Sequence, residues 1–218
     1  DLDSVGNTTL TGILDIAGTS DLTVSDNLVI DGNYTGGAKV TIDVVGTTAI
    51  TNSGENAFTV GGALDLDSVG IAALTGTFDV TGASMLNIGE ESTDSALELT
   101  GTFTGKDSTT MNVTGSTTLD GSLAVTNDLM IDGTGAITLG NSVSATGNMA
   151  LNGGSSVSVA GLLDVGGSLD LDSAGNTELS GTVSVGGTSG LTVGENLAIA
   201  GDYTGVGAIT LDVTGSTT

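Results

Sequence analysis

The sequence predicts an all-β protein, namely a parallel β-solenoid (β-helix) built from short, hexapeptide-like strands. Three observations lead to this prediction. An apolar residue recurs at every sixth position, the chain is rich in glycine and poor in aromatic residues, and long stretches of the sequence are repeated. The handedness of the winding is left open by all three.

The six-residue spacing is clearest from Leu10 to Val40. Counting in sixes from Leu10 gives Ile16, Leu22, Leu28, Tyr34 and Val40, with mostly Gly, Thr, Ser, Asp and Asn in between. In an α-helix, six steps rotate a side chain by about 240°, so these residues would scatter around the helix. In a strand, any even spacing returns to the same face. Hexapeptide periods are typical of β-helices.

Further runs of the same spacing follow along the chain, and the spacing slips between them. The slip occurs twice in related sequence, from Leu64 to Leu74 and from Leu169 to Leu179. A slip that recurs in this way predicts a corner or a bulge, and it implies that some coils are larger than others. The longer runs are Leu119, Val125, Ile131, Ile137, Val143, Met149; Leu151, Val157, Leu163, Leu169; and Leu179, Val185, Leu191, Leu197, Tyr203, Ile209.

Each short strand is expected to end at a glycine. In "TFDVTG" (77–82) and "LLDVGG" (162–167), two apolar residues flank a polar one and glycine follows. The apolar pair faces inward, and glycine supplies the positive φ that a sharp corner needs. Three such sides would make a coil of about 18 residues, and roughly twelve coils would stack into a rod about 55–60 Å long.

A longer repeat indicates one continuous solenoid array over residues 1–218. Residues 1–48 align without a gap to residues 170–217, and a more divergent copy starts at Asp65, so repeats begin near 1, 65 and 170. Both ends of the chain fall inside repeat units. We therefore expect a segment of a longer array, or units that join end to end.

Composition excludes several classes of partner. The 218 residues carry a formal net charge of -24, with 26 acidic residues against Lys39 and Lys106. Nucleic acid and anionic membranes are not expected as partners, because phosphate contacts need Lys and Arg. No apolar run is long enough for membrane insertion, and the chain lacks cysteine. These features fit an extracellular or cell-surface location.

The outward-facing aspartates are the candidate metal ligands. If coils stacked them in register, neighbouring carboxylates would repel by about 0.9 kcal/mol per pair in water. Either the register staggers them, or Ca²⁺ bridges them, or they form a solvated acidic face that limits lateral aggregation. No metal site is assigned, and no cofactor other than Ca²⁺ is considered. The Ca²⁺ candidates, each between apolar neighbours, are Asp15, Asp43, Asp79, Asp164 and Asp212.

Catalysis is not expected. The chain has no His, Cys or Arg, which excludes catalytic triads, thiol nucleophiles and guanidinium clamps. Its acidic residues follow the repeat instead of converging on one place. Tyr34 and Tyr203 occupy equivalent repeat positions and are interpreted as packing residues at a wide corner. Three glycosylation sequons, at Asn7, Asn33 and Asn112, are of the number expected by chance in a threonine-rich chain.

Two stretches resemble known repeat proteins. "GNTTLTGILDIAG" (6–18) and "VTGSTTLDGSLAVTND" (113–128) look like the Thr/Gly-rich repeats of bacterial surface and filament proteins, of filamentous-haemagglutinin-like adhesins and of phage tail fibres. The resemblance covers nearly the whole chain, but such repeats have low specificity. It implies a secreted, rod-like structural role and transfers no functional residue.

The leading hypothesis is a non-enzymatic extracellular filament or cell-surface stalk that assembles with itself, end to end, as a homopolymer. The alternative is an adhesin shaft or phage tail-fibre segment that presents a binding tip, with the cell surface or host glycans as partners. An ice-binding solenoid is a third hypothesis. It needs a flat Thr-x-Thr array, and the threonines are not expected to keep one register.

Overall fold

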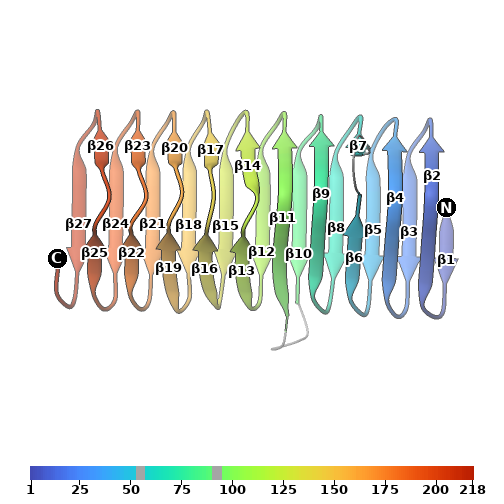
Figure 1. Cartoon of the computed structure of the whole chain (residues 1–218), viewed down its shortest axis with the longest axis horizontal. Coiled ribbons are helices and arrows are strands. Elements are labelled where there is room, and N and C mark those ends of the chain that lie inside the picture. The colour runs from blue at the N-terminus through green and yellow to red at the C-terminus, as the bar shows by residue number, and fades with distance from the viewer. Residues whose placement is uncertain (53–56, 90–94) are drawn as a thin grey trace.

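The computed structural model describes residues 1–52, 57–89 and 95–218. Every assigned element in these ranges is a β-strand, and the strands stack in parallel into a β-solenoid of about ten turns. Figure 1 shows the coils side by side along one long axis, with the two chain ends at opposite ends of the rod. The predicted fold class is confirmed.

One wall of the solenoid is an 11-stranded sheet, here called sheet A. Each coil contributes one strand to it, and most of these strands have five residues. In sheet order they are β1 (Leu2–Ser4), β3 (Ser20–Val24), β5 (Val40–Val44), β8 (Leu64–Ser68), β10 (Ser84–Ile88), β12 (Thr109–Val113), β15 (Leu129–Gly133), β18 (Met149–Gly153), β21 (Leu169–Ser173), β24 (Ser189–Val193) and β27 (Ile209–Val213).

The opposite wall is a 16-stranded sheet, here called sheet B. In its N-terminal half most coils contribute one long strand, and in its C-terminal half each coil contributes two short ones. The strands of the first half are β2 (Thr8–Ile16), β4 (Leu28–Gly36), β6 (Thr48–Thr51), β7 (Phe58–Val60), β9 (Ala72–Val80) and β11 (Ala96–Gly105). Those of the second half are β13 (Ser116–Leu119), β14 (Ser122–Val125), β16 (Ala136–Leu139), β17 (Val143–Ala145), β19 (Ser156–Val159), β20 (Leu163–Val165), β22 (Thr177–Leu179), β23 (Val183–Val185), β25 (Leu197–Ile199) and β26 (Tyr203–Gly205).

The usual coil has 20 residues, so the predicted coil of about 18 residues is wrong. Leu2 pairs with Leu22, and Leu22 pairs with Ile42. Two coils are longer, as the sequence predicted: Tyr34 pairs with Phe58, and Ala72 pairs with Leu97. Longer coils mean fewer of them, about ten instead of the expected twelve.

The recurring slip in the hexapeptide spacing has a simple structural cause, and it is neither a corner nor a bulge. Three hexapeptides supply 18 residues, and the other two lie within the five-residue strand of sheet A. In β8, Leu64, Leu66 and Ser68 all face inward, and the strand pairs in unbroken register with both neighbours. A five-residue strand therefore places three residues inside, and the next run starts from the third of them, four residues after the first: Ser68 is six residues before Leu74, and Ser173 is six before Leu179.

The interior is a stack of aliphatic layers. Leu22, Leu28 and Leu197 are buried, as the spacing predicted. Burying such a side chain contributes about 1.5–3 kcal/mol, and each coil covers the apolar face of its neighbour. In the N-terminal half the core also contains one row of rings from four successive coils, with centroids 4.6, 5.6 and 6.3 Å apart: Tyr34, Phe58, Phe78 and Phe103. Tyr34 packs as predicted, but it lies within β4 and not at a corner.

The prediction that glycines supply positive φ at the corners is mostly wrong. Four of the five positive-φ glycines lie inside long strands of sheet B: Gly12, Gly32, Gly76 and Gly101. Only Gly89 directly follows a strand. Other glycines are required because the backbone of the previous coil lies where a Cβ would project. At Gly61, for example, a Cβ would come within 2.7 Å of the Gly37 carbonyl oxygen.

Candidate functional site

The most regular polar feature is a single row of side chains on the outer face of sheet A, here called the Asp/Asn column. It consists of the second outward position of each strand, and the register places its members directly beside one another. In order they are Asp3, Thr23, Asp43, Asp67, Asn87, Asn112, Asp132, Asn152, Asp172, Thr192 and Asp212.

Side-chain amides link three members of this column. The Nδ2 of Asn87 donates a hydrogen bond to Oδ1 of Asp67 at 2.7 Å, and the Nδ2 of Asn112 donates to Oδ1 of Asn87 at 2.8 Å. An asparagine can accept on one side and donate on the other, so it suits a stack with a repeat of about 4.8 Å. Sequence analysis missed this row because it considered aspartates alone and did not align the asparagines with them.

The mixture of Asp, Asn and Thr in the column explains how stacked carboxylates are tolerated. Asp43 and Asp67 are in register, so the backbone does not stagger them. Elsewhere Asn or Thr separates the acids: Asn152 lies between Asp132 and Asp172. Neutral residues in the same row remove most of the repulsion that an all-aspartate column would create.

The five Ca²⁺ candidates do not form one site. Asp15, Asp79 and Asp164 lie on sheet B, and Asp43 and Asp212 lie on sheet A. Asp79 instead forms an ion pair with Lys106 at 2.9 Å. The described residues contain no group of three or more His, Cys, Asp or Glu side chains that would hold a metal ion. Calcium binding at these five positions stays a prediction without a common geometry.

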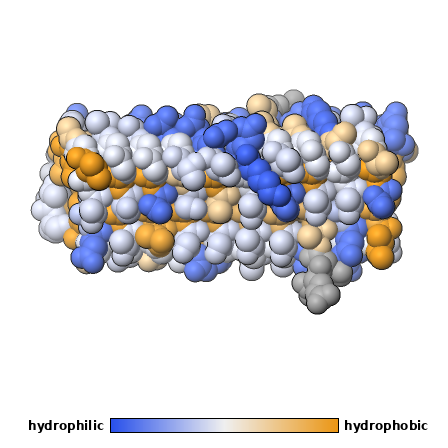
Figure 2. Space-filling model, turned by 90° about the horizontal axis from the view of Figure 1, so that it is seen from above, coloured by the Kyte–Doolittle hydropathy of each residue, from blue (hydrophilic) through white to orange (hydrophobic). Residues whose placement is uncertain are grey.

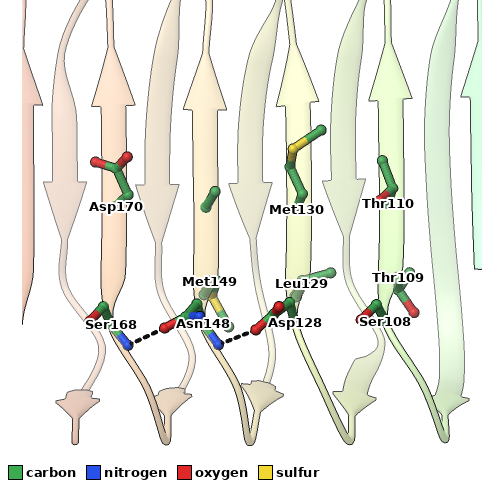
Figure 3. A pocket seen from close by; sticks show the side chains of 11 residues that line it. Ser108, Thr109, Thr110, Asp128, Leu129, Met130, Asn148, Met149, Ser168 and Asp170 are labelled. Carbon is green, nitrogen blue, oxygen red and sulfur yellow. Dashed lines mark hydrogen bonds between the residues drawn. The ribbon is translucent and has the colours of Figure 1, made fainter. Parts of the chain in front are cut away.

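A second polar row follows the edge where the chain enters sheet A. The backbone N–H of Asn148 donates to Oδ1 of Asp128 at 2.7 Å, and the N–H of Ser168 donates to Oδ1 of Asn148 at 3.0 Å (Figure 3). The row borders a shallow groove that is also lined by Met130. Each side chain satisfies a turn N–H of the next coil, so the row is explained by structure alone.

An equivalent row lies at the opposite edge of sheet A. Asn27 donates its Nδ2 to Oδ1 of Asn7 at 2.8 Å, and its own Oδ1 accepts from the backbone N–H and the hydroxyl of Thr47, both at 2.8 Å. The same arrangement recurs near the other end, where the Asn196 side chain bonds to Asn176 and accepts from Ser216. Asn7 of the first sequon therefore has a structural role.

Threonine columns on sheet B are more regular than the sequence suggested. Thr75 pairs with Thr100 and Thr77 with Thr102, so the expectation that threonines keep no register is wrong for β9 and β11. Among the described residues, these two columns carry Thr-x-Thr together only on β9 and β11. Thr51 extends one column, and Asp31 then interrupts it. So narrow an array is a weak basis for ice binding.

Among the described residues, the surroundings shift the pKa of Asp107, Tyr34 and Tyr203. Hydrogen bonds from the Asn127 side chain and the Ser108 backbone N–H lower the pKa of Asp107. Burial raises the pKa of Tyr34, and the nearby charge of Asp21 adds to this, whereas the hydrogen bond with the Ser20 hydroxyl acts in the opposite direction. Asp107 lies at a turn and Tyr34 lies in the core, so these two groups do not form a common site.

No family model, no curated protein and no solved structure matches the chain. None of the described residues forms a helix with the length and hydropathy needed to span a membrane. What defines the molecule is its architecture, which is a parallel β-solenoid of stacked coils with polar rows running along its outside.

Proposed function

We propose that the protein is a non-enzymatic structural rod, a segment of an extracellular filament or cell-surface stalk in which β-solenoid coils stack end to end. The observation that carries the proposal is the in-register column structure. Functional groups on the outer faces repeat from coil to coil along the rod, and the ionisable groups follow the repeat instead of gathering at one pocket.

The direction of the hydrogen bonds favours a mechanical role. Backbone bonds join each coil to the next, as from the Val45 N–H to the Val24 carbonyl at 3.0 Å and from the Val69 N–H to the Val44 carbonyl at 3.0 Å. They therefore run along the rod axis and resist extension together. A solenoid of this kind grows by adding coils that cover the apolar face of the last one.

The two end strands of sheet A favour contact with further coils. Among the described residues, β1 and β27 each pair on one side only. The inward positions Ile209 and Leu211 of β27 are 46% and 47% exposed, and Figure 2 shows hydrophobic surface at both ends of the rod. Unpaired strand edges of this kind accept another strand.

An internal junction provides a template for an end-to-end contact. By the long repeat, β27 corresponds to β5, and the "DLDS" stretch at 1–4 corresponds to 65–68 in β8. Since β5 and β8 pair in register, with Ile42 beside Leu66, β27 of one copy and β1 of the next have matching sequences for the same pairing. Sheet B would lack the strand that β6 and β7 supply internally, so such a joint would be held mainly through sheet A.

Electron microscopy of the purified protein at increasing concentration tests the proposal. We expect unbranched filaments with an axial repeat of about 4.8 Å. Leu211→Lys should prevent filament growth, because it places a charge on the apolar end. The matched control Thr210→Lys, on the outward side of the same strand, should leave growth intact.

Defined trimers instead of filaments would overturn the end-to-end proposal. They would favour the second candidate, an adhesin shaft or phage tail-fibre segment that carries a binding tip to the cell surface or to host glycans. The resemblance of residues 6–18 and 113–128 to the repeats of such proteins supports this candidate. Light scattering, which gives the mass in solution, separates the two.

A further inference from the structure

The amide chain of the Asp/Asn column has a direction. Asn112 donates through Nδ2 to Asn87, and Asn87 donates through Nδ2 to Asp67. The amide nitrogen and oxygen of an asparagine side chain point away from each other. Because Nδ2 of Asn112 is directed to the preceding coil, its Oδ1 is directed to the following one.

The next member of the column cannot continue this chain. Asn112 pairs in register with Asp132, and an ionised carboxylate accepts hydrogen bonds without donating any. Two acceptors therefore face each other across one coil step. Within the described part of the chain, the side chain of Asp132 makes no hydrogen bond, and neither do the hydroxyls of Thr114 and Thr134.

These four residues line one small hollow on the rod. Asn112, Thr114, Asp132 and Thr134 all border it, together with Asn87. The hollow thus offers an amide oxygen, a carboxylate and two hydroxyl oxygens from two adjacent coils. Carbonyl and carboxylate oxygens with additional water are the ligands that Ca²⁺ prefers, and its coordination geometry is flexible.

We propose that this hollow, the Asn112–Asp132 site, binds a divalent cation of the Ca²⁺ type. The cation would lie between the two facing acceptors, a position that no protein donor fills. A net charge of -24 raises the local concentration of cations around the rod. With a single carboxylate, half-saturation is expected at about 10⁻⁴–10⁻³ M, the range of weak extracellular calcium modules.

The column contains a matched internal comparison. Asn152 and Asp172 repeat the Asn–Asp pair two coils further on, and they are also in register. Here Gly154 and Ala174 replace Thr114 and Thr134, so neither residue of the pair is followed two positions later by a hydroxyl. The wider hollow beside this pair also includes Asp132, Thr134 and Thr192. Within the described residues no side-chain hydrogen bond orients the Asn152 amide, so its Nδ2 can donate to Asp172, and we expect weaker cation binding at this second pair.

Titration of the complete 218-residue chain with CaCl₂, followed by NMR of backbone and asparagine side-chain amides, tests the site. Saturable shifts should be confined to Asn112, Asp132 and their neighbours. Asp132→Asn should weaken binding at least tenfold. This variant should still fold, because an asparagine at 132 can donate to Asn112 Oδ1 and extend the amide chain. Asp172→Asn is the comparison and should weaken binding less than Asp132→Asn.

Two further variants test the hydroxyl ligands, since Thr114→Val and Thr134→Val should each weaken binding several-fold and leave the amide chain intact. The proposal is overturned if no residue shifts on adding CaCl₂. It is also overturned if shifts spread over all the aspartates without saturation, or if Asp132→Asn and Asp172→Asn change the titration equally. Those last two results would indicate only a diffuse layer of counterions.

Discussion

The two halves of sheet B differ in the backbone conformation at the middle of each coil's segment. In the N-terminal half, β2, β4, β9 and β11 run straight through a central glycine with positive φ (Figure 1). In the C-terminal half the strand breaks at the equivalent position, and two successive N–H groups share one carbonyl. Examples are Ser180 and Gly181, which both donate to the Val159 carbonyl at 2.9 and 3.1 Å.

The difference is not encoded in the local sequence. "LTGTF" at 99–103 forms a continuous strand, whereas the similar "LSGTV" at 179–183 is broken. The change occurs where β11 pairs with β9 on one side and with β13 and β14 on the other. The two conformations meet at this junction, and in the C-terminal half each coil repeats the broken strand of the coil before it.

The largest effect should come from the core beneath these strands. Phe78→Ala should cost about 3–5 kcal/mol of unfolding free energy, because it interrupts the ring stack between Phe58 and Phe103. Leu163→Ala, at the equivalent position of the C-terminal half, should cost less, within about 2–5 kcal/mol. Urea unfolding of both variants measures the difference. A smaller cost for Phe78→Ala would show that the rings add nothing beyond aliphatic packing.

Alanine at the central glycines tests the conformational difference directly. Gly101 has a φ of +130°, and the Gly76 carbonyl oxygen lies where its Cβ would project. Gly181 has no positive φ, but the carbonyl oxygens of Gly161 and Ala160 lie where its Cβ would project. Because both Cβ atoms would meet backbone carbonyls, the strained φ is what distinguishes the two positions. Gly101→Ala should therefore cost about 1–3 kcal/mol more than Gly181→Ala, the price of the strained φ. Gly190→Ala is the control, since its Cβ would meet only Asp170 Oδ1 at 3.5 Å. Equal losses of unfolding free energy for Gly101→Ala and Gly181→Ala would contradict the claim that only Gly101 needs a positive φ.

The asparagine rows at the edges of sheet A should contribute less to the free energy of unfolding than the core or the central glycines. Asn27→Ala removes an acceptor for two Thr47 groups and a donor to Asn7, so we expect a loss of about 1 kcal/mol in unfolding free energy. Asn148→Ala removes only the acceptor for the Ser168 N–H and should cost less. Thermal unfolding compares them, with Ser144→Ala as a surface control. A larger loss for Asn148→Ala than for Asn27→Ala would mean that the hydrogen bonds of exposed Asn27 add no stability over hydrogen bonds to water.

The smallest effect should be a pH dependence in the N-terminal half. Burial raises the pKa of Tyr34, so its contribution to stability is complete below the ordinary tyrosine pKa of about 10 and is lost as pH rises through the higher folded value. In a Tyr203→Phe background, which leaves one tyrosine, ultraviolet titration should give a midpoint above that of free tyrosine. A midpoint at or below the free value would contradict the burial of Tyr34.

The sequence predicted the features that depend on periodicity. The inward positions Leu22, Leu28 and Leu197 and the outward aspartates follow from a six-residue period in strands. The length of the coil did not follow, because the third inward residue of a sheet A strand can be a serine or glycine, as at Ser68 and Gly133, and so escapes an apolar count. Which asparagines continue which aspartates also depends on the 20-residue register, which appears only once the coils are stacked.

Distances along the Asp/Asn column test the central claim that the chain winds into parallel, in-register coils. The chain has no cysteine, so spin labels can be placed on cysteines introduced at Thr23 and Asp132, or at Thr23 and Thr192, which lie five and eight coil steps apart. At about 4.8 Å per step, pulsed electron resonance should give distances near 24 Å and 38 Å. Similar distances for the two pairs, or a longer one for the first, would contradict the solenoid.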